Sequence, residues 1–112
     1  MEPRLASSVL VGALMRKAQC EGGFAAILAR GDDSAGSILV ILLERGGPSR
    51  LYERILQPDG GYRWDSGAVQ PGAESEVPEL VVRRRRFDPD LWVVELDVPS
   101  AERFAAEMNS LD

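Results

Sequence analysis

The sequence predicts an α+β domain in which three helices accompany an antiparallel sheet of about five strands. Its 112 residues suffice for one hydrophobic core, so we expect a single domain over residues 1–112. Apolar residues recur at helical spacing in some segments, and at alternate positions or in short continuous runs in others. The order of these segments is α-β-β-β-β-α-β-α, which lacks the regular alternation of α/β proteins.

A first helix is predicted from Ser7 or Ser8, either of which can cap it, to about Glu21, where Gly22 and Gly23 supply a left-handed end. Its main apolar face consists of Leu10, Val11, Leu14, Met15 and Ala18, and a weaker face consists of Val9, Ala13 and Cys20. Because the apolar surface is so broad, we expect the helix to be covered on more than one side. The sheet with another helix, or a partner subunit, could provide that cover.

Four strands are expected next, at residues 24–30, 37–45, 50–57 and 62–66. Residues 31–36 are turn formers, so the first two strands are predicted to form a hairpin. Residues 38–43 are continuously apolar, which favours a central strand covered on both faces. The third strand alternates, with Leu51, Glu53 and Ile55 opposite Tyr52, Arg54 and Leu56.

A surface loop is predicted over residues 67–75, which are rich in glycine, proline, alanine and glutamate. A helix follows, with Pro78 in its first turn and an end near Arg86, because the Asp88-Pro89 pair breaks helices. Residues 91–98 form the fifth predicted strand. Ser100 then caps a last helix whose apolar face is Ala101, Phe104, Ala105, Met108 and Leu111.

Composition excludes several classes of function. The net charge is −5 and the isoelectric point is near 4.8, so nucleic-acid binding is disfavoured. Histidine is absent, which excludes serine–histidine and cysteine–histidine mechanisms. Asp32 and Asp33 lack the spacing of a calcium loop. We therefore expect no metal, no cofactor and no enzymatic activity.

Location follows from the single cysteine and from hydropathy. Cys20 cannot form an internal disulfide, which favours a reducing compartment, and we expect a cytoplasmic protein. The apolar stretch at residues 9–15 is too short to cross a bilayer and is closed by Arg16 and Lys17, so no membrane association is expected.

Arg83, Arg84, Arg85 and Arg86 form the most unusual segment, because basic clusters can mark nucleic-acid or anion sites. Successive residues of a helix rotate by about 100°, however, so the four side chains spread around the axis. Only Arg83 and Arg86 share the outward side, and Glu79 is placed to pair with Arg83. Helix-dipole stabilisation of basic residues near a C-terminus is the favoured interpretation.

Arg84 points along the apolar stripe formed by Val77, Leu80 and Val81, so we expect it to be at least partly buried. A buried guanidinium costs several kcal/mol unless it is paired. The strand at residues 91–98 offers Glu95 on its Val93 side, and Arg84 with Glu95 is the predicted pair. A structural ion pair is favoured over an anion-binding site at Arg84.

A family resemblance rests mainly on the sequence RRRRFDPDLWVVE at residues 83–95, and also on the early helix that leads into GGFAA at residues 22–26. In these segments the chain resembles a small alphaproteobacterial family, domain of unknown function 1491. The resemblance implies a cytoplasmic protein of one domain. It implies no activity, cofactor or catalytic residue.

The leading functional hypothesis is a non-enzymatic protein-interaction module that forms a homodimer and binds an unknown protein partner. The broad apolar face of the first helix and the aromatic later strands are the predicted contact surfaces. A nucleic-acid or anion-binding module using Arg83 and Arg86 is the alternative. An enzyme that works without histidine, through carboxylates and arginines, is a third and less favoured hypothesis.

Overall fold

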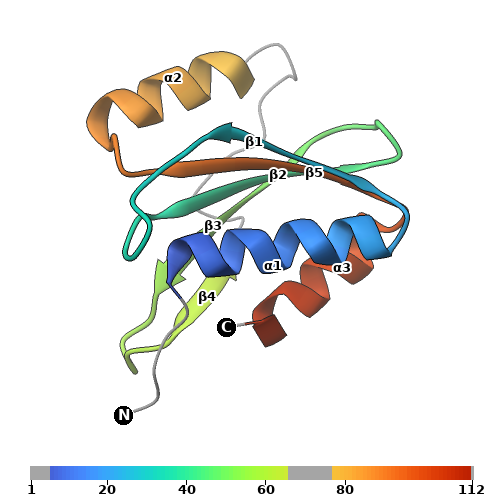
Figure 1. The fold of residues 1–112 in the computed structure, drawn as a ribbon, viewed down its shortest axis with the longest axis horizontal. Coiled ribbons are helices and arrows are strands. Elements are labelled where there is room, and N and C mark those ends of the chain that lie inside the picture. The colour runs from blue at the N-terminus through green and yellow to red at the C-terminus, as the bar shows by residue number, and fades with distance from the viewer. Residues whose placement is uncertain (1–5, 66–76, 112) are drawn as a thin grey trace.

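The structure, a computed structural model, describes residues 6–65 and 77–111, and within them the elements follow the order α-β-β-β-β-α-β-α (Figure 1). The helices are α1 (Ser7–Cys20), α2 (Val77–Phe87) and α3 (Ala101–Met108), and a short 3-10 helix, Asn109–Leu111, follows α3. The strands are β1 (Phe24–Ala29), β2 (Ile38–Glu44), β3 (Arg50–Leu56), β4 (Tyr62–Asp65) and β5 (Trp92–Val98). The predicted α+β class is confirmed. The loop predicted over residues 67–75 lies outside the described residues.

The strands form one sheet in the order β1-β5-β2-β3-β4. β1 pairs antiparallel with β5, β2 pairs antiparallel with β3, and β3 pairs antiparallel with β4. The pairing of β2 with β5 is parallel. The sheet is thus mostly antiparallel, and its antiparallel meander consists of β2, β3 and β4.

The hairpin predicted from the first two strands is wrong, because β5 lies between β1 and β2. β5 buries apolar side chains on both faces of the sheet: Trp92, Val94, Leu96 and Val98 contact the larger core cluster, and Val93 contacts the smaller one. A strand of this kind is stabilised most at the centre of a sheet, where both faces are covered. Loop residues 31–36 therefore cross the end of β5, and the Trp92 N–H donates to the Ser37 carbonyl at 2.8 Å.

Helices cover the two faces of the sheet in three layers, with α1 and α3 on one side and α2 on the other (Figure 1). The larger core cluster joins α1 and α3 to the sheet through side chains such as Leu10, Leu14, Trp92 and Phe104. A smaller cluster lies under α2 and contains Leu39, Ile41, Leu51, Leu91 and Val93. β2 is therefore buried on both faces, as predicted.

α1 begins at Ser7, one residue earlier than it would if Ser7 were its N-cap. Ala6 occupies the cap position without a side-chain hydrogen bond, so capping by Ser7 or Ser8 is not observed. The buried Ser7 hydroxyl instead donates to the Gly36 carbonyl at 2.6 Å, which ties the start of the helix to loop residues 31–36. The predicted end is confirmed, with Gly22 at a φ of 86°.

The loop between β1 and β2 contacts the Asp90 backbone directly. A Cβ atom at Gly31 would lie 2.0 Å from the Asp90 carbonyl oxygen, and one at Gly36 would lie 2.2 Å from it. Only glycine permits this approach. Hydrogen bonds from Ser7 and Ser8 to carbonyls of the same loop place it next to the start of α1.

α2 and α3 differ in how firmly they are packed. In α3, Ser100 caps the helix by accepting from the Arg103 N–H, and Phe104 and Met108 are fully buried. In α2 no residue is fully buried. Its apolar side chains Val77, Leu80 and Val81 pack against the smaller cluster but are only partly buried. Polar contacts of α2 therefore matter more to its position than those of α3.

Candidate functional site

Arg84 on α2 pairs with Glu53 on β3. The side chains are 30% and 19% exposed respectively, so the predicted partial burial of Arg84 is confirmed. The predicted partner, Glu95, is wrong. Glu53 and Val93 both pair with Leu39, so Glu53 lies at the level of Val93, whereas Glu95 lies two residues further along β5. Helical arithmetic identified the face of Arg84, but the partner depends on strand order.

Arg85 fastens the end of α2 to the sheet. Its Nη1 group donates to the Pro89 carbonyl at 2.6 Å, the Leu91 carbonyl at 2.9 Å and the Arg30 carbonyl at 2.9 Å. These bonds connect the turn after α2 with the start of β5 and the end of β1. The sequence offered one signal for this role, because basic side chains in the last turn of a helix can bond nearby carbonyls.

Arg83 and Arg86 are exposed, as predicted. Among the described residues neither makes an ion pair, so the expected pairing of Glu79 with Arg83 is wrong. With Pro78, Glu79 and Val82 they line a shallow depression of about 370 Å³ on the outer side of α2. The possible basic surface of the run thus consists of two arginines, not four.

Glu95 lies in a depression of about 410 Å³ between α2 and the sheet. Its neighbours there are mainly apolar: Leu28, Ile41, Val77, Pro78 and Val81, with Ser49 at the edge. Within the described residues its carboxylate accepts no hydrogen bond and forms no ion pair. The structure therefore separates Glu95 from Arg84.

Exposed large apolar side chains lie on both β1 and α2. Phe24 is 76% exposed, Leu28 is 50% exposed and Val82 is 59% exposed. Pro78 connects the strand with the helix, since it lines both depressions named above. We call Phe24, Leu28, Pro78 and Val82 the β1–α2 patch. It lies at an edge of the sheet, because β1 is a terminal strand.

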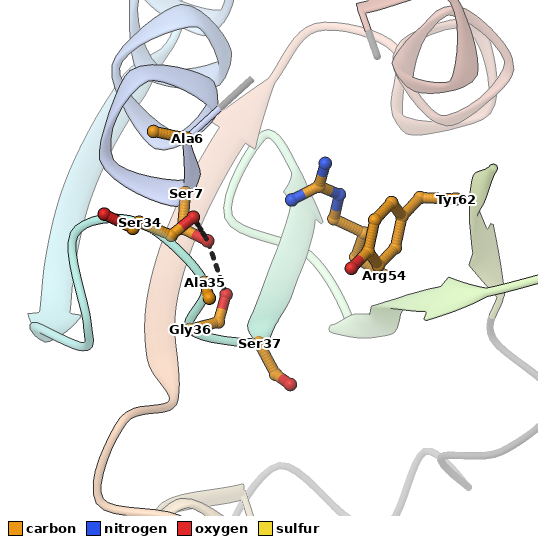
Figure 2. A pocket seen from close by; sticks show the side chains of 8 residues that line it. All are labelled: Ala6, Ser7, Ser34, Ala35, Gly36, Ser37, Arg54 and Tyr62. Atoms are coloured by element: carbon orange, nitrogen blue, oxygen red, sulfur yellow. Dashed lines mark hydrogen bonds between the residues drawn. The ribbon is translucent and has the colours of Figure 1, made fainter. Parts of the chain in front are cut away.

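A polar cavity of about 360 Å³ lies at the start of α1 (Figure 2). Its lining consists of Ala6, Ser7, Ser34, Ala35, Gly36, Ser37, Arg54 and Tyr62. Arg54, from β3, is only 8% exposed, and its guanidinium carbon lies 4.0 Å from the centre of the Tyr62 ring. The alternation of β3 already placed Arg54 on the side of Tyr52, which contacts the larger core, so a signal for a buried arginine was present in the sequence.

Lys17 links α1 to α3. Its Nζ atom lies 2.6 Å from Glu21 and 3.0 Å from Glu107. The hydrogen bond to Glu21, followed by that to Glu107, raises the pKa of Lys17, although partial burial opposes the shift. The hydrogen bond from Lys17 lowers the pKa of Glu107. None of these three residues lines the depressions and the cavity described above, and we assign the cluster to stability.

Two absences concern the described residues alone. In residues 6–65 and 77–111, no group of three or more histidine, cysteine, aspartate or glutamate side chains is placed to hold a metal ion. The helices of the same residues include none long and apolar enough to cross a bilayer.

Comparison with known proteins gives a consistent family assignment. The model of the family described as "Protein of unknown function (DUF1491)" matches residues 5–106. A crystal structure of a DUF1491 family protein from Caulobacter crescentus is similar, with 33% identity, a TM-score of 0.79, and coverage of 90% of this chain and 94% of that one. A solution structure from A. tumefaciens shares 33% identity and a TM-score of 0.75, with 91% and 92% of the two chains covered. No curated protein matches the sequence.

Proposed function

The chain belongs to the DUF1491 family of proteins of unknown function, and from this premise we propose that it is a non-enzymatic protein-interaction module that forms a homodimer. The observation that carries the proposal is the β1–α2 patch. Single exposed apolar residues are common on protein surfaces, but contiguous ones mark interaction sites. Here three large apolar side chains are at least half exposed, and Leu28 on β1 lines one depression together with Pro78 on α2.

The position of the patch at a sheet edge adds a second argument. An edge strand presents unpaired backbone groups that another strand can bind. If two copies paired their β1 strands antiparallel about Ala26, Phe24 of each copy would face Leu28 of the other, and both patches would meet across the two-fold axis. One patch would then serve both copies, as a symmetric dimer requires.

The same geometry limits the strength of the dimer. The pairing of β1 with β5 shifts register between Ile27 and Ala29, and such bulges hinder the extension of a sheet. Only the first residues of β1 remain regular for pairing, so side-chain contacts must provide most of the association. We expect a dissociation constant in the micromolar range, roughly 1–100 μM.

α1 is less suited to be the interface than its sequence indicates. The sheet and α3 cover the broad apolar face of α1 within the chain. Cover by the sheet and another helix was one of the two alternatives expected from the sequence, and cover by a partner subunit was the other. Val9 is 50% exposed on α1, but Leu10, Val11 and Leu14 of this helix are buried and Met15 is partly buried. We therefore propose the β1–α2 patch, and not α1, as the dimer contact.

Sedimentation velocity between about 1 μM and 1 mM protein, which spans the expected dissociation constant, tests the proposal. We expect the mass to rise with concentration from 12.2 kDa towards twice that value. Leu28→Lys should abolish the rise, whereas Val9→Lys, at a residue of equal exposure on another face, should leave it unchanged. A mass of 12.2 kDa at every concentration, or equal loss in both variants, would overturn the homodimer.

Anion binding at Arg83 and Arg86 is the second candidate function. The observation in its favour is that both side chains are exposed and without an ion pair among the described residues. The net charge of −5 opposes it.

The exposed thiol of Cys20 fits a reducing compartment, and we propose that the protein acts in the cytoplasm.

A further inference from the structure

The depression between α2 and the sheet has the size and lining of a small-molecule site. Its volume is about 410 Å³, and ligand pockets typically measure roughly 300–1,000 Å³. The described lining residues come from β1, β2, β5, the segment before β3 and the first turns of α2, and most are apolar: Leu28, Ile41, Val77, Pro78 and Val81. Such a surface binds the apolar body of a ligand, because contact removes that body from water.

Glu95 is the exception in this lining. Its side chain is partly buried, and alternation along β5 places it with Val93 on the face of the sheet that α2 covers. Among the described lining residues it is the one with a formally charged side chain at neutral pH. The depression therefore combines an apolar surface with a single negative charge.

The Glu95 carboxylate has no cation to neutralise it. Within the described residues it forms neither an ion pair nor a hydrogen bond. Arg84 pairs with Glu53 instead, and Arg85 donates to three backbone carbonyls. Residues 66–76, which precede α2 in the chain, contain no lysine or arginine. A carboxylate among apolar side chains loses part of its hydration, and an opposite charge compensates that loss best.

We propose that this depression binds a small organic cation, in which an ammonium group is attached to an apolar body. The ammonium group pairs with the Glu95 carboxylate, and the apolar body contacts Leu28, Val77 and Val81. Because the carboxylate is only partly buried, water and salt screen the ion pair. The charge therefore determines which ligand is preferred, and the apolar contact provides most of the affinity.

This site does not rest on the proposed homodimer. Leu28 and Pro78 belong both to the depression and to the β1–α2 patch, whereas Glu95 belongs to the depression alone. Phe24 belongs to the patch and is not among the residues that line the depression. Phe24→Ser should therefore weaken the dimer and leave the binding of the cation in place, so that the two proposals can fail separately. Loss of cation binding in Phe24→Ser would overturn a site within a single copy.

NMR titration of the full chain at pH 7 with 2-phenylethylammonium chloride tests the proposal, with ionic strength held constant by sodium chloride. 2-Phenylethanol and 3-phenylpropanoate carry a similar apolar body and serve as the neutral and anionic probes. We expect saturable shifts at the amides of residues 79–81 and 94–96, with a dissociation constant of about 0.1–10 mM for the ammonium. The alcohol should bind about three- to tenfold more weakly, and the carboxylate more weakly still. No saturable shift with the ammonium, or equal affinity for the ammonium and the alcohol, would overturn the proposal.

Two variants that each remove one carboxylate locate the binding. Glu95→Gln keeps the size and polarity of the side chain, and should lower the affinity for the ammonium to that for the alcohol. Glu102→Gln makes the same change at an exposed residue of α3, on the other side of the sheet, and should leave all three affinities unchanged (Figure 1). A preference for the ammonium that survives Glu95→Gln, or that is lost equally in Glu102→Gln, would refute the assignment. The comparison of the three probes uses the wild-type chain, so it decides the question even if Glu95→Gln does not fold.

Discussion

Replacing Arg84 with alanine tests how α2 is held on the sheet. No residue of α2 is fully buried, so the ion pair of Arg84 with Glu53 is one of the few specific contacts of this helix. The substitution removes the guanidinium and leaves the Glu53 carboxylate, which is 19% exposed, with no cation in its place. A carboxylate in that position loses hydration on folding without compensation.

The expected cost lies between two limits. Breaking a fully buried pair costs about 3–5 kcal/mol, and breaking a fully exposed pair costs at most about 1 kcal/mol. Because Arg84 is 30% exposed, solvent screens the pair in part, and we expect a loss of about 2–3 kcal/mol. With a urea m-value of about 1.5 kcal/mol/M, a loss of 2.5 kcal/mol lowers the unfolding midpoint by roughly 1.7 M.

Urea denaturation of a double-mutant cycle measures the pair directly. Arg84→Ala, Glu53→Ala and the double variant should reveal a coupling of about 1–2 kcal/mol. Arg84→Met with Glu53→Leu should recover much of the loss, because both desolvation costs disappear. Arg83→Ala is the control on the exposed side of α2 and should change stability by less than about 0.5 kcal/mol. A wild-type midpoint for Arg84→Ala, or equal coupling of Arg84 to Glu95, would refute the assigned pair.

Two further predictions concern charge. The hydrogen bond from Lys17 holds the pKa of Glu107 below its usual range, so its stabilisation is present at neutral pH and is lost as the pH falls below about 4.3. Urea curves of wild type and Glu107→Gln should therefore converge in acid, and a difference that persists there would contradict the assignment. Arg83 and Arg86 offer few phosphate contacts. Fluorescence anisotropy at physiological salt should therefore detect no complex with RNA or DNA whose dissociation constant is below about 1 μM. Tighter binding that is lost in the Arg83→Glu/Arg86→Glu variant would favour the second candidate function.

The order and type of the elements were predictable because they depend on local patterns. The end of α1 at Gly22 and the cap at Ser100 are set by residues within one turn of each helix. The position of β5 was not predictable in this way. Residues 31–36 look like a hairpin turn, and only competition with a strand more than fifty positions away separates β1 from β2.

The candidate sites also combine features that local sequence patterns predict with features that depend on distant segments. The inward direction of Arg84 follows from rotation along the helix and was predicted, but its partner depends on which strand lies under α2 and at what register. The cavity at Arg54 joins the first turn of α1, a loop, and two strands of the meander. No pattern within any one of these segments indicates the others.

The run of Arg83 to Arg86 shows why adjacent like charges are a poor measure of a binding surface. Arg84 pairs with a carboxylate on β3, and Arg85 donates to the carbonyls of Pro89, Leu91 and Arg30, which lie after α2, before β5 and after β1. Their charges are used inside the fold, which leaves two exposed guanidinium groups on a protein of net charge −5. The isolated Arg54 has no basic neighbour in sequence, yet it is the arginine that lines a polar cavity. Consecutive arginines in a sequence therefore do not by themselves form a basic surface, because the fold can direct some of their charges to partners within the chain.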